Sequence, residues 1–152
     1  MVKLDIKRNE RDWAGQLISW IKSAIDRKTT VFQDATNDTG VKMKSGRTKF
    51  PDILLFVDKT SGVIFNGWEL KYPDTAVDDI DMLENALEKA QKLHSDSFVT
   101  WNGAEAIIWH IDDGEYTLDS LSKLKVYPKV STINSREDLA DPVKFAQHEP
   151  LL

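Results

Sequence analysis

The sequence predicts a mixed α/β domain in which helices pack on a central sheet. Two stretches with helical periodicity flank a group of short strands rich in β-branched residues, and two further strands follow the second helix. This order of helix, three strands, helix and two strands, in a chain of 152 residues, is typical of one domain built on one sheet.

The first helix is predicted over residues 10–25, with Asn9 as its cap. Its apolar residues recur with the spacing of one helical face. They are Trp13, Ala14, Leu17, Ile21 and Ala24. The β-branched segment 29–36 is predicted to be the first strand, and residues 37–49 a loop, or a loop with a short ribbon.

Two strands, over residues 53–57 and 63–71, are predicted to form a hairpin around the turn sequence KTSG. A second helix follows over residues 78–94. Its apolar stripe is Ile80, Leu83, Leu87, Ala90 and Leu93. Strands 97–101 and 106–111 are joined by the Asn-Gly turn of the sequence NGAE. Beyond residue 116 the pattern weakens.

Composition restricts the class of protein. No apolar stretch approaches the ~20 residues of a membrane helix, and the N-terminal segment has no apolar secretory core. The absence of cysteine excludes disulfides and thiolate zinc sites, and favours the cytoplasm. The net charge of −5 argues against strong non-specific binding of nucleic acid by the whole surface, but leaves room for a local basic patch.

The ends of the predicted hairpin carry three charged residues. If residues 59–62 form a four-residue turn, Asp58 pairs with Val63 and Asp52 faces Glu69. Facing residues have Cβ atoms roughly 4.5–5.5 Å apart and point to one side of the sheet, and Lys71 points to that side too. The hairpin therefore predicts two carboxylates and an amine at one end of the sheet.

Like charges that face each other across a ladder destabilise it unless something compensates. Mg²⁺ would do so, since it binds a few carboxylate oxygens together with waters and substrate phosphates. A cation beside an ammonium group suits phosphodiester hydrolysis, because the cation activates water and the amine stabilises developing charge. The plainer interpretation is an edge salt bridge between Glu69 and Lys71, with Asp52 capping a turn.

The motif resembles that of the PD-(D/E)xK nuclease superfamily, with Pro51-Asp52 as the first element and Glu69-Leu70-Lys71 as the second. The resemblance implies a restriction-endonuclease-like core of order αβββαβ, a central mixed sheet flanked by helices. It also implies that Asp52 and Glu69 bind Mg²⁺, with Mn²⁺ as a substitute, and that Lys71 assists the attacking water. Glu10 on the first helix is placed to be a further metal ligand.

Basic residues precede the motif in the sequence KMKSGRTK. We expect its four cations to contact DNA phosphates, although a solubilising loop would look the same. These residues are Lys42, Lys44, Arg47 and Lys49. Gln91 on the second helix lies where some members of the superfamily place a glutamine near the substrate.

The C-terminal part resembles the connector that follows a nuclease domain in restriction–modification polypeptides. We therefore expect residues 1–122 to form the nuclease domain and 123–152 a linker or arm toward a methyltransferase or helicase domain. Double-strand cleavage would then need a transient dimer, a second copy of the domain or two encounters.

The leading hypothesis is the DNA-cleaving module of a restriction enzyme. The alternatives are a repair or recombination nuclease, such as an exonuclease or junction resolvase, and a non-catalytic nucleic-acid-binding module with the same fold. A sugar-cleaving carboxylate pair would leave Lys71 unexplained.

Overall fold

The structure is a computed structural model, and it describes residues 10–27, 31–36, 41–42, 48–49, 52–58, 60–128, 133 and 135. The side chains of residues 10–13, 41–42 and 48–49 lie outside this description. The elements in chain order are α1 (Glu10–Arg27), β1 (Asp34–Thr36), β2 (Val41–Lys42), β3 (Thr48–Lys49), β4 (Ile53–Asp58), β5 (Val63–Leu70), α2 (Ile80–Leu93), β6 (Ser97–Trp101), β7 (Ala106–Ile111), the 3₁₀ turns η1 (Asp112–Gly114) and η2 (Leu118–Ser120), and β8 (Leu121–Tyr127).

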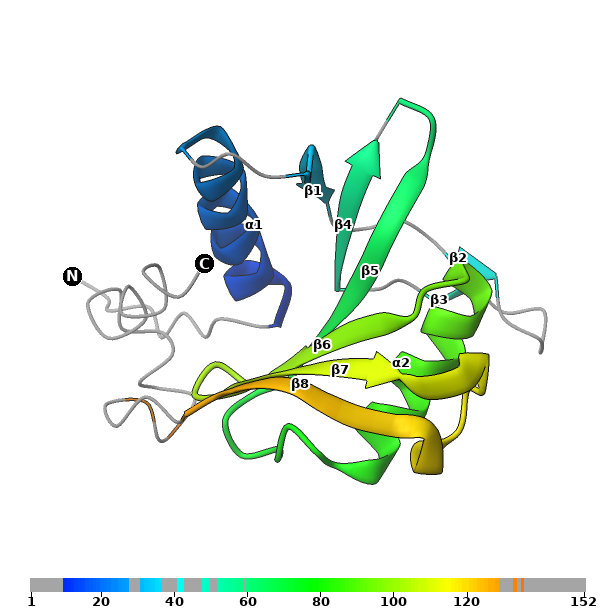
Figure 1. Ribbon diagram of the computed structural model, residues 1–152. Coiled ribbons are helices and arrows are strands. Elements are labelled where there is room, and N and C mark those ends of the chain that lie inside the picture. The colour runs from blue at the N-terminus through cyan, green and yellow to red at the C-terminus, as the bar shows by residue number, and fades with distance from the viewer. Residues whose placement is uncertain are drawn as a thin grey trace.

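Six of the strands form one mixed sheet with the order β1-β4-β5-β6-β7-β8 (Figure 1). Neighbouring strands are antiparallel except β5 and β6, which are parallel because α2 carries the chain back between them. Strands β2 and β3 make a separate two-stranded ribbon, which was one of the two predictions for residues 37–49.

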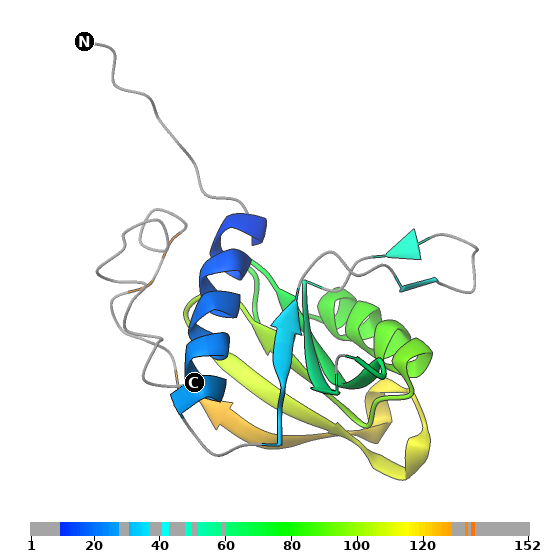
Figure 2. The same cartoon turned by 90° about the horizontal axis from the view of Figure 1, so that it is seen from above.

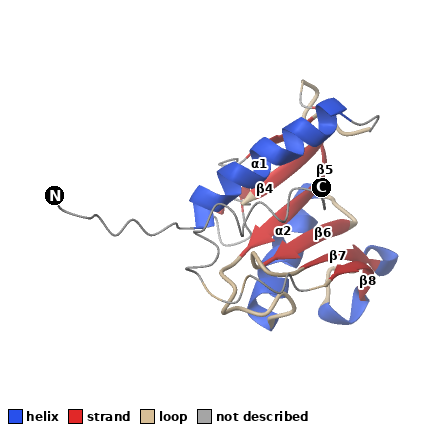
Figure 3. Ribbon diagram, turned by 90° about the vertical axis from the view of Figure 1, so that its left-hand side faces the viewer, coloured by secondary structure: helices blue, strands red, loops and turns tan. Residues whose placement is uncertain are grey.

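The two described helices lie on opposite faces of the sheet (Figures 2 and 3). Helix α1 buries Ala14, Leu17 and Ile21 against one face, in a core that includes residues of β1, β4, β5 and β6. Helix α2 packs on the other face, where Phe98 and Trp109 belong to its core. The α/β class is confirmed, and two helices around a six-stranded mixed sheet are consistent with a restriction-endonuclease-like core.

The sequence of α2 defines both of its ends. Asp79 caps the first turn, where its carboxylate accepts a hydrogen bond of 3.1 Å from the backbone N–H of Met82. His94 ends the helix in the left-handed conformation, with φ of 54°. The predicted apolar stripe is rotated in the structure, because Ile80 is 61% exposed whereas Met82 is 1% exposed.

The predicted register of the hairpin is confirmed. Asp58 pairs with Val63, and Ile53 pairs with Trp68. Two irregularities interrupt the ladder between residues 55 and 58, and they offset each other, so the same register holds on both sides of them. Extending it by one residue places Asp52 opposite Glu69, as the turn length predicted.

Two strand predictions need correction. The first strand begins at Asp34, so the described residues 31–33 of the predicted strand precede it, and residues 29–30 lie outside the described residues. Strand β8 was not predicted at all, yet it pairs along β7 and completes the sheet. The boundary expected at residue 122 therefore falls inside β8, and Ile133, in the expected linker, is fully buried in the core under α1. Whether a further domain follows stays a prediction.

Neither helix among the described residues is both long enough and apolar enough to cross a membrane.

Candidate active site

The three charged residues of the motif lie at one end of the hairpin, where the start of β4 pairs with the end of β5. Asp52 directly precedes β4, Glu69 is the second-last residue of β5, and Lys71 directly follows it. A carboxylate oxygen of Asp52, Oδ2, accepts a hydrogen bond of 2.7 Å from the backbone N–H of Leu70. The backbone N–H of Lys71 donates to the Trp101 carbonyl at 2.9 Å, which continues the β5–β6 pairing for one more residue. The motif is thus attached to the sheet on both sides.

Glu69 points to the α2 face of the sheet and is only 7% exposed. Its Oε1 lies 2.6 Å from the Nζ of Lys89, which reaches it from α2 and is itself 8% exposed. Both side chains line a small cavity of about 10 Å³ beside Gly67. The partner of Glu69 in the salt bridge is therefore Lys89, and not Lys71 as the plainer interpretation of the sequence has it.

Sequence reasoning missed Lys89. Its one signal is position, because Lys89 comes three residues after the buried Ala86 and four before Leu93, and so shares their side of the helix. A lysine at a core-facing position requires a charged or polar partner.

Burial is the main reason why the pKa of Glu69 is raised, to about 7 from 4.5. The ammonium of Lys89 opposes this shift, the negative charge of Asp52 adds to it, and Lys71 makes a smaller opposing contribution. The four side chains therefore form one electrostatic cluster of two acids and two amines. We call Asp52, Glu69, Lys71 and Lys89 the charge cluster.

This raised pKa predicts that the protein loses stability as the pH increases. The folded state binds a proton at Glu69 that the unfolded chain has already released, so the contribution is fully present below pH 4.5 and is lost as the pH rises through about 7. The difference amounts to about 3 kcal/mol in the free energy of unfolding. Urea unfolding at pH 5, 6, 7 and 8 measures it.

Glu69→Gln is the control, because glutamine has the same shape and does not titrate. Subtracting its unfolding free energy from that of the wild type at each pH isolates the Glu69 contribution. A difference that stays flat, or that favours the wild type increasingly from pH 5 to 8, would contradict the prediction.

The donor set fits a hard divalent cation of the Mg²⁺ type. Asp52 and Glu69 are close enough for the charge of one to raise the pKa of the other, and a cation between them would remove that repulsion. No group of three or more His, Asp or Glu side chains that could hold a metal ion occurs among the described residues. Two carboxylates are sufficient for Mg²⁺, which keeps several waters and takes further oxygens from substrate phosphates.

The other predicted metal ligand, Glu10, is the first residue of α1, and its side chain lies outside the described residues. Lys42 is on β2 and Lys49 on β3, again without described side chains. Lys44 and Arg47 lie outside the described residues altogether. The roles assigned to these five residues stay predictions.

Gln91 is a partly buried residue of α2. Residues two positions apart do not share a helix face, so Gln91 does not face Glu69 alongside Lys89. Its contact with substrate stays a prediction.

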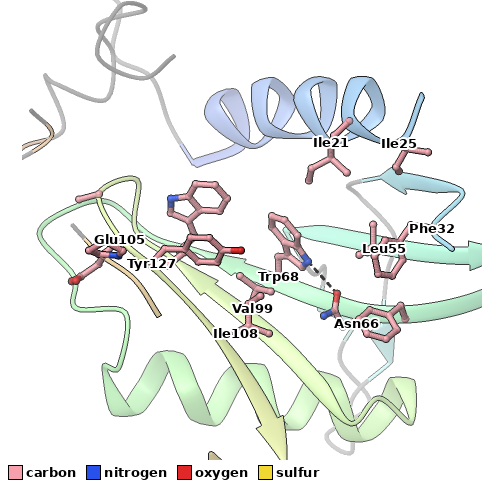
Figure 4. Close-up of a pocket in the computed structure, with 16 residues that line it drawn as sticks. Ile21, Ile25, Phe32, Leu55, Asn66, Trp68, Val99, Glu105, Ile108 and Tyr127 are labelled. Atoms are coloured by element: carbon pink, nitrogen blue, oxygen red, sulfur yellow. Dashed lines mark hydrogen bonds between the residues drawn. The ribbon is translucent and has the colours of Figure 1, made fainter. Parts of the chain in front are cut away.

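A larger cavity, of about 320 Å³, lies on the opposite face of the sheet, between α1 and the strands (Figure 4). Its walls are mostly apolar, and Ile21, Val99 and Ile108 are among them. The indole N–H of Trp68 donates to Oδ1 of Asn66 at 3.1 Å across one side of it. Because Glu69 points to the α2 face, this cavity is not part of the charge cluster.

The chain has little similarity to known proteins. No family model matches the chain, and no curated protein is significantly similar to it. Among solved structures, part of a chain in the cryo-EM structure of a DrdV–DNA complex superposes on 91% of this chain, with a TM-score of 0.48 and 14% sequence identity. The superposed part is 11% of that chain, so the present chain spans about a ninth of its length.

Proposed function

We propose that this chain is a metal-dependent endonuclease domain that hydrolyses DNA phosphodiester bonds, as the cleavage module of a restriction enzyme. One observation carries the proposal: two carboxylates and an amine from a hairpin come together at one end of the sheet, in the register that the motif requires. A structural salt bridge does not need a second acid close enough to raise the pKa of the first, whereas a cation site uses both acids as ligands.

Asp52 and Glu69 are the residues that would hold the cation, Mg²⁺ or Mn²⁺, with Glu10 as the predicted further ligand. When bound, such a cation lowers the pKa of a water and neutralises phosphate charge. Asp52 is kept in place by its hydrogen bond from the Leu70 N–H, and Glu69 by its burial. The half-buried Lys71 presents an ammonium group that would orient the attacking water or stabilise the charge that develops on the phosphate.

DNA is the partner that this chemistry implies. The basic segment that contains Lys42 and Lys49 directly precedes the motif in sequence and is proposed to contact the phosphate backbone. Such contacts fix the position of the duplex but do not read its sequence. Sequence recognition is therefore assigned to another part of a longer polypeptide.

Replacing Lys71 by methionine tests the proposal. We expect the rate at which supercoiled plasmid is converted to open circles, in Mg²⁺ or Mn²⁺, to fall roughly 100-fold, because a charge that acts on the reacting groups is lost. Divalent cation affinity, measured by calorimetry on the same samples, should not weaken, because Lys71 is not a ligand. Chelation with EDTA should abolish nicking in the wild type.

Lys92→Met is the matched control, since Lys92 is an exposed lysine in the last turn of α2 and the same charge is removed. Its nicking rate should equal that of the wild type. Equal rates for Lys71→Met and wild type would reject the catalytic role of Lys71, and nicking that resists EDTA would reject metal dependence.

A non-catalytic nucleic-acid-binding module is the second candidate, and one contact favours it. Lys89 already neutralises Glu69 in the absence of any cation, so the pair is stable without a metal. This candidate predicts metal-independent DNA binding, seen as a shift in gel mobility, with no nicking in either cation.

A further inference from the structure

The salt bridge between Lys89 and Glu69 engages one of the carboxylates that are proposed to bind the cation. Nζ of Lys89 lies 2.6 Å from Oε1 of Glu69, and less than a tenth of either residue is exposed. Lys89 belongs to α2, whereas Asp52, Glu69 and Lys71 belong to the hairpin. A residue from outside the motif therefore holds one of the two proposed metal ligands.

The charge cluster is balanced as it stands. Two carboxylates and two ammonium groups have no net charge when all four are ionised. Adding a divalent cation would bring two further positive charges to a site where Glu69 and Lys89 are shielded from water. Uncompensated charge in such surroundings is strongly unfavourable. A cation can bind well only if one of the ammonium groups withdraws or if an anion enters with it.

We propose that Lys89 is an internal competitor of the divalent cation, which holds Glu69 in the metal-free protein and must release it when the cation binds. The inference rests on the proposed metal site. Lys89 is the amine that must leave, because it contacts a ligand oxygen directly, and its electrostatic effect on Glu69 exceeds that of Lys71. Lys71 has the smaller electrostatic effect on Glu69, and in the proposed function it acts on the water and phosphate instead.

Two consequences follow from the competition. The metal-free site stays folded, because Glu69 is never left without a counter-charge. Cation affinity in the absence of DNA is low, and it rises when a phosphodiester group enters and supplies negative charge. Lys89 thus couples the binding of metal to the binding of substrate, without being a catalytic residue itself.

Calorimetric titration of Mg²⁺ and Mn²⁺ into Lys89→Gln tests the inference. Glutamine can still donate a hydrogen bond to Glu69 but has no charge. We expect the dissociation constant to fall roughly tenfold relative to wild type, since one repelling charge beside the cation is gone. Lys89→Arg, which keeps the charge, and Lys92→Gln, which removes an exposed charge from the same helix, should both bind as the wild type does.

A second test uses the wild-type protein. Reductive methylation followed by mass spectrometry reports the accessibility of each lysine amine. Lys89 should react slowly in EDTA, because it is buried and paired, and several-fold faster when Mg²⁺ is added. Lys92 should react equally under both conditions.

Unchanged or weaker cation binding by Lys89→Gln, or methylation of Lys89 that Mg²⁺ does not accelerate, would overturn the inference. Weaker binding would mean that Lys89 positions Glu69 for the cation. Asp52→Asn distinguishes a failure of the competition by Lys89 from a failure of the proposed metal site. If it abolishes binding while Lys89→Gln changes nothing, only the competition fails. If wild type and Lys89→Gln both bind no cation, the proposed function fails and this inference fails with it.

Discussion

Replacing Asp52 by asparagine should abolish metal-dependent nicking, with a loss of at least roughly 1000-fold in rate, while the protein stays folded. Asp52 is one of the two carboxylates of the hairpin proposed to hold the cation, so the substitution removes one of the two ligand charges that the hairpin supplies. Calorimetry should show no detectable binding of Mg²⁺ at millimolar concentration. Plasmid nicking and calorimetry on one preparation measure both effects.

Asparagine is a sharper replacement than alanine because of what Asp52 does for the fold. Its Oδ2 accepts a hydrogen bond from the backbone N–H of Leu70, and the amide oxygen of asparagine can accept the same bond. Asp52→Ala would leave that N–H unpaired at a cost of about 1–3 kcal/mol. Loss of activity in Asp52→Asn with an unchanged melting temperature would therefore report on the charge alone.

Two results would contradict this expectation. Nicking by Asp52→Asn within tenfold of the wild-type rate would exclude Asp52 as a metal ligand. Loss of activity together with a large loss of stability would assign Asp52 to the fold, as the turn-capping interpretation of the sequence has it.

The part of the site on the hairpin could be predicted from the sequence because it depends on local information. A turn length fixes which residues face each other, and a period of two fixes which side each points to. The prediction needed the two ladder irregularities near Phe56 to offset each other, which nothing in the sequence indicates. One uncompensated bulge would have moved Asp52 out of register with Glu69.

The structure around β8 could not be predicted in the same way. Leu124 and Val126 on this edge strand are 63% and 52% exposed, so the strand has no alternation of apolar and polar residues to detect. Its pairing with β7 is what makes it a strand. Ile133 was likewise placed in a linker, because a single apolar residue has no periodicity, although it is fully buried in the structure.

Lys89 shows how far the buried face of a helix can be predicted from the sequence. The stripe read from the sequence was centred on Leu83 and Leu87, with the exposed Ile80 as a member. In the structure Met82 and Ala86 are buried as well, and the buried side extends around the helix as far as Lys89. Helical periodicity cannot set the edge of a stripe to better than one residue, and here that residue is a member of the site.

Replacing Lys89 by methionine should destabilise the metal-free protein by about 3–5 kcal/mol at pH 8, because it leaves the charge of Glu69 buried without its counter-ion. The penalty should be smaller at pH 5, where Glu69 takes up a proton and no charge remains to be compensated. Urea unfolding at the two pH values, in EDTA, measures both.

The double variant Glu69→Leu/Lys89→Met completes the test. An apolar pair of similar volume often replaces a buried ion pair with no loss of stability, so the double variant should be about as stable as the wild type at both pH values. A double-mutant cycle then gives the interaction free energy between Glu69 and Lys89. A cost below about 1 kcal/mol for Lys89→Met at pH 8 would mean that water reaches Glu69 and screens its charge. Water that reached Glu69 would also remove the reason why its proposed cation must displace an amine, so this stability measurement bears directly on the competition inferred for Lys89.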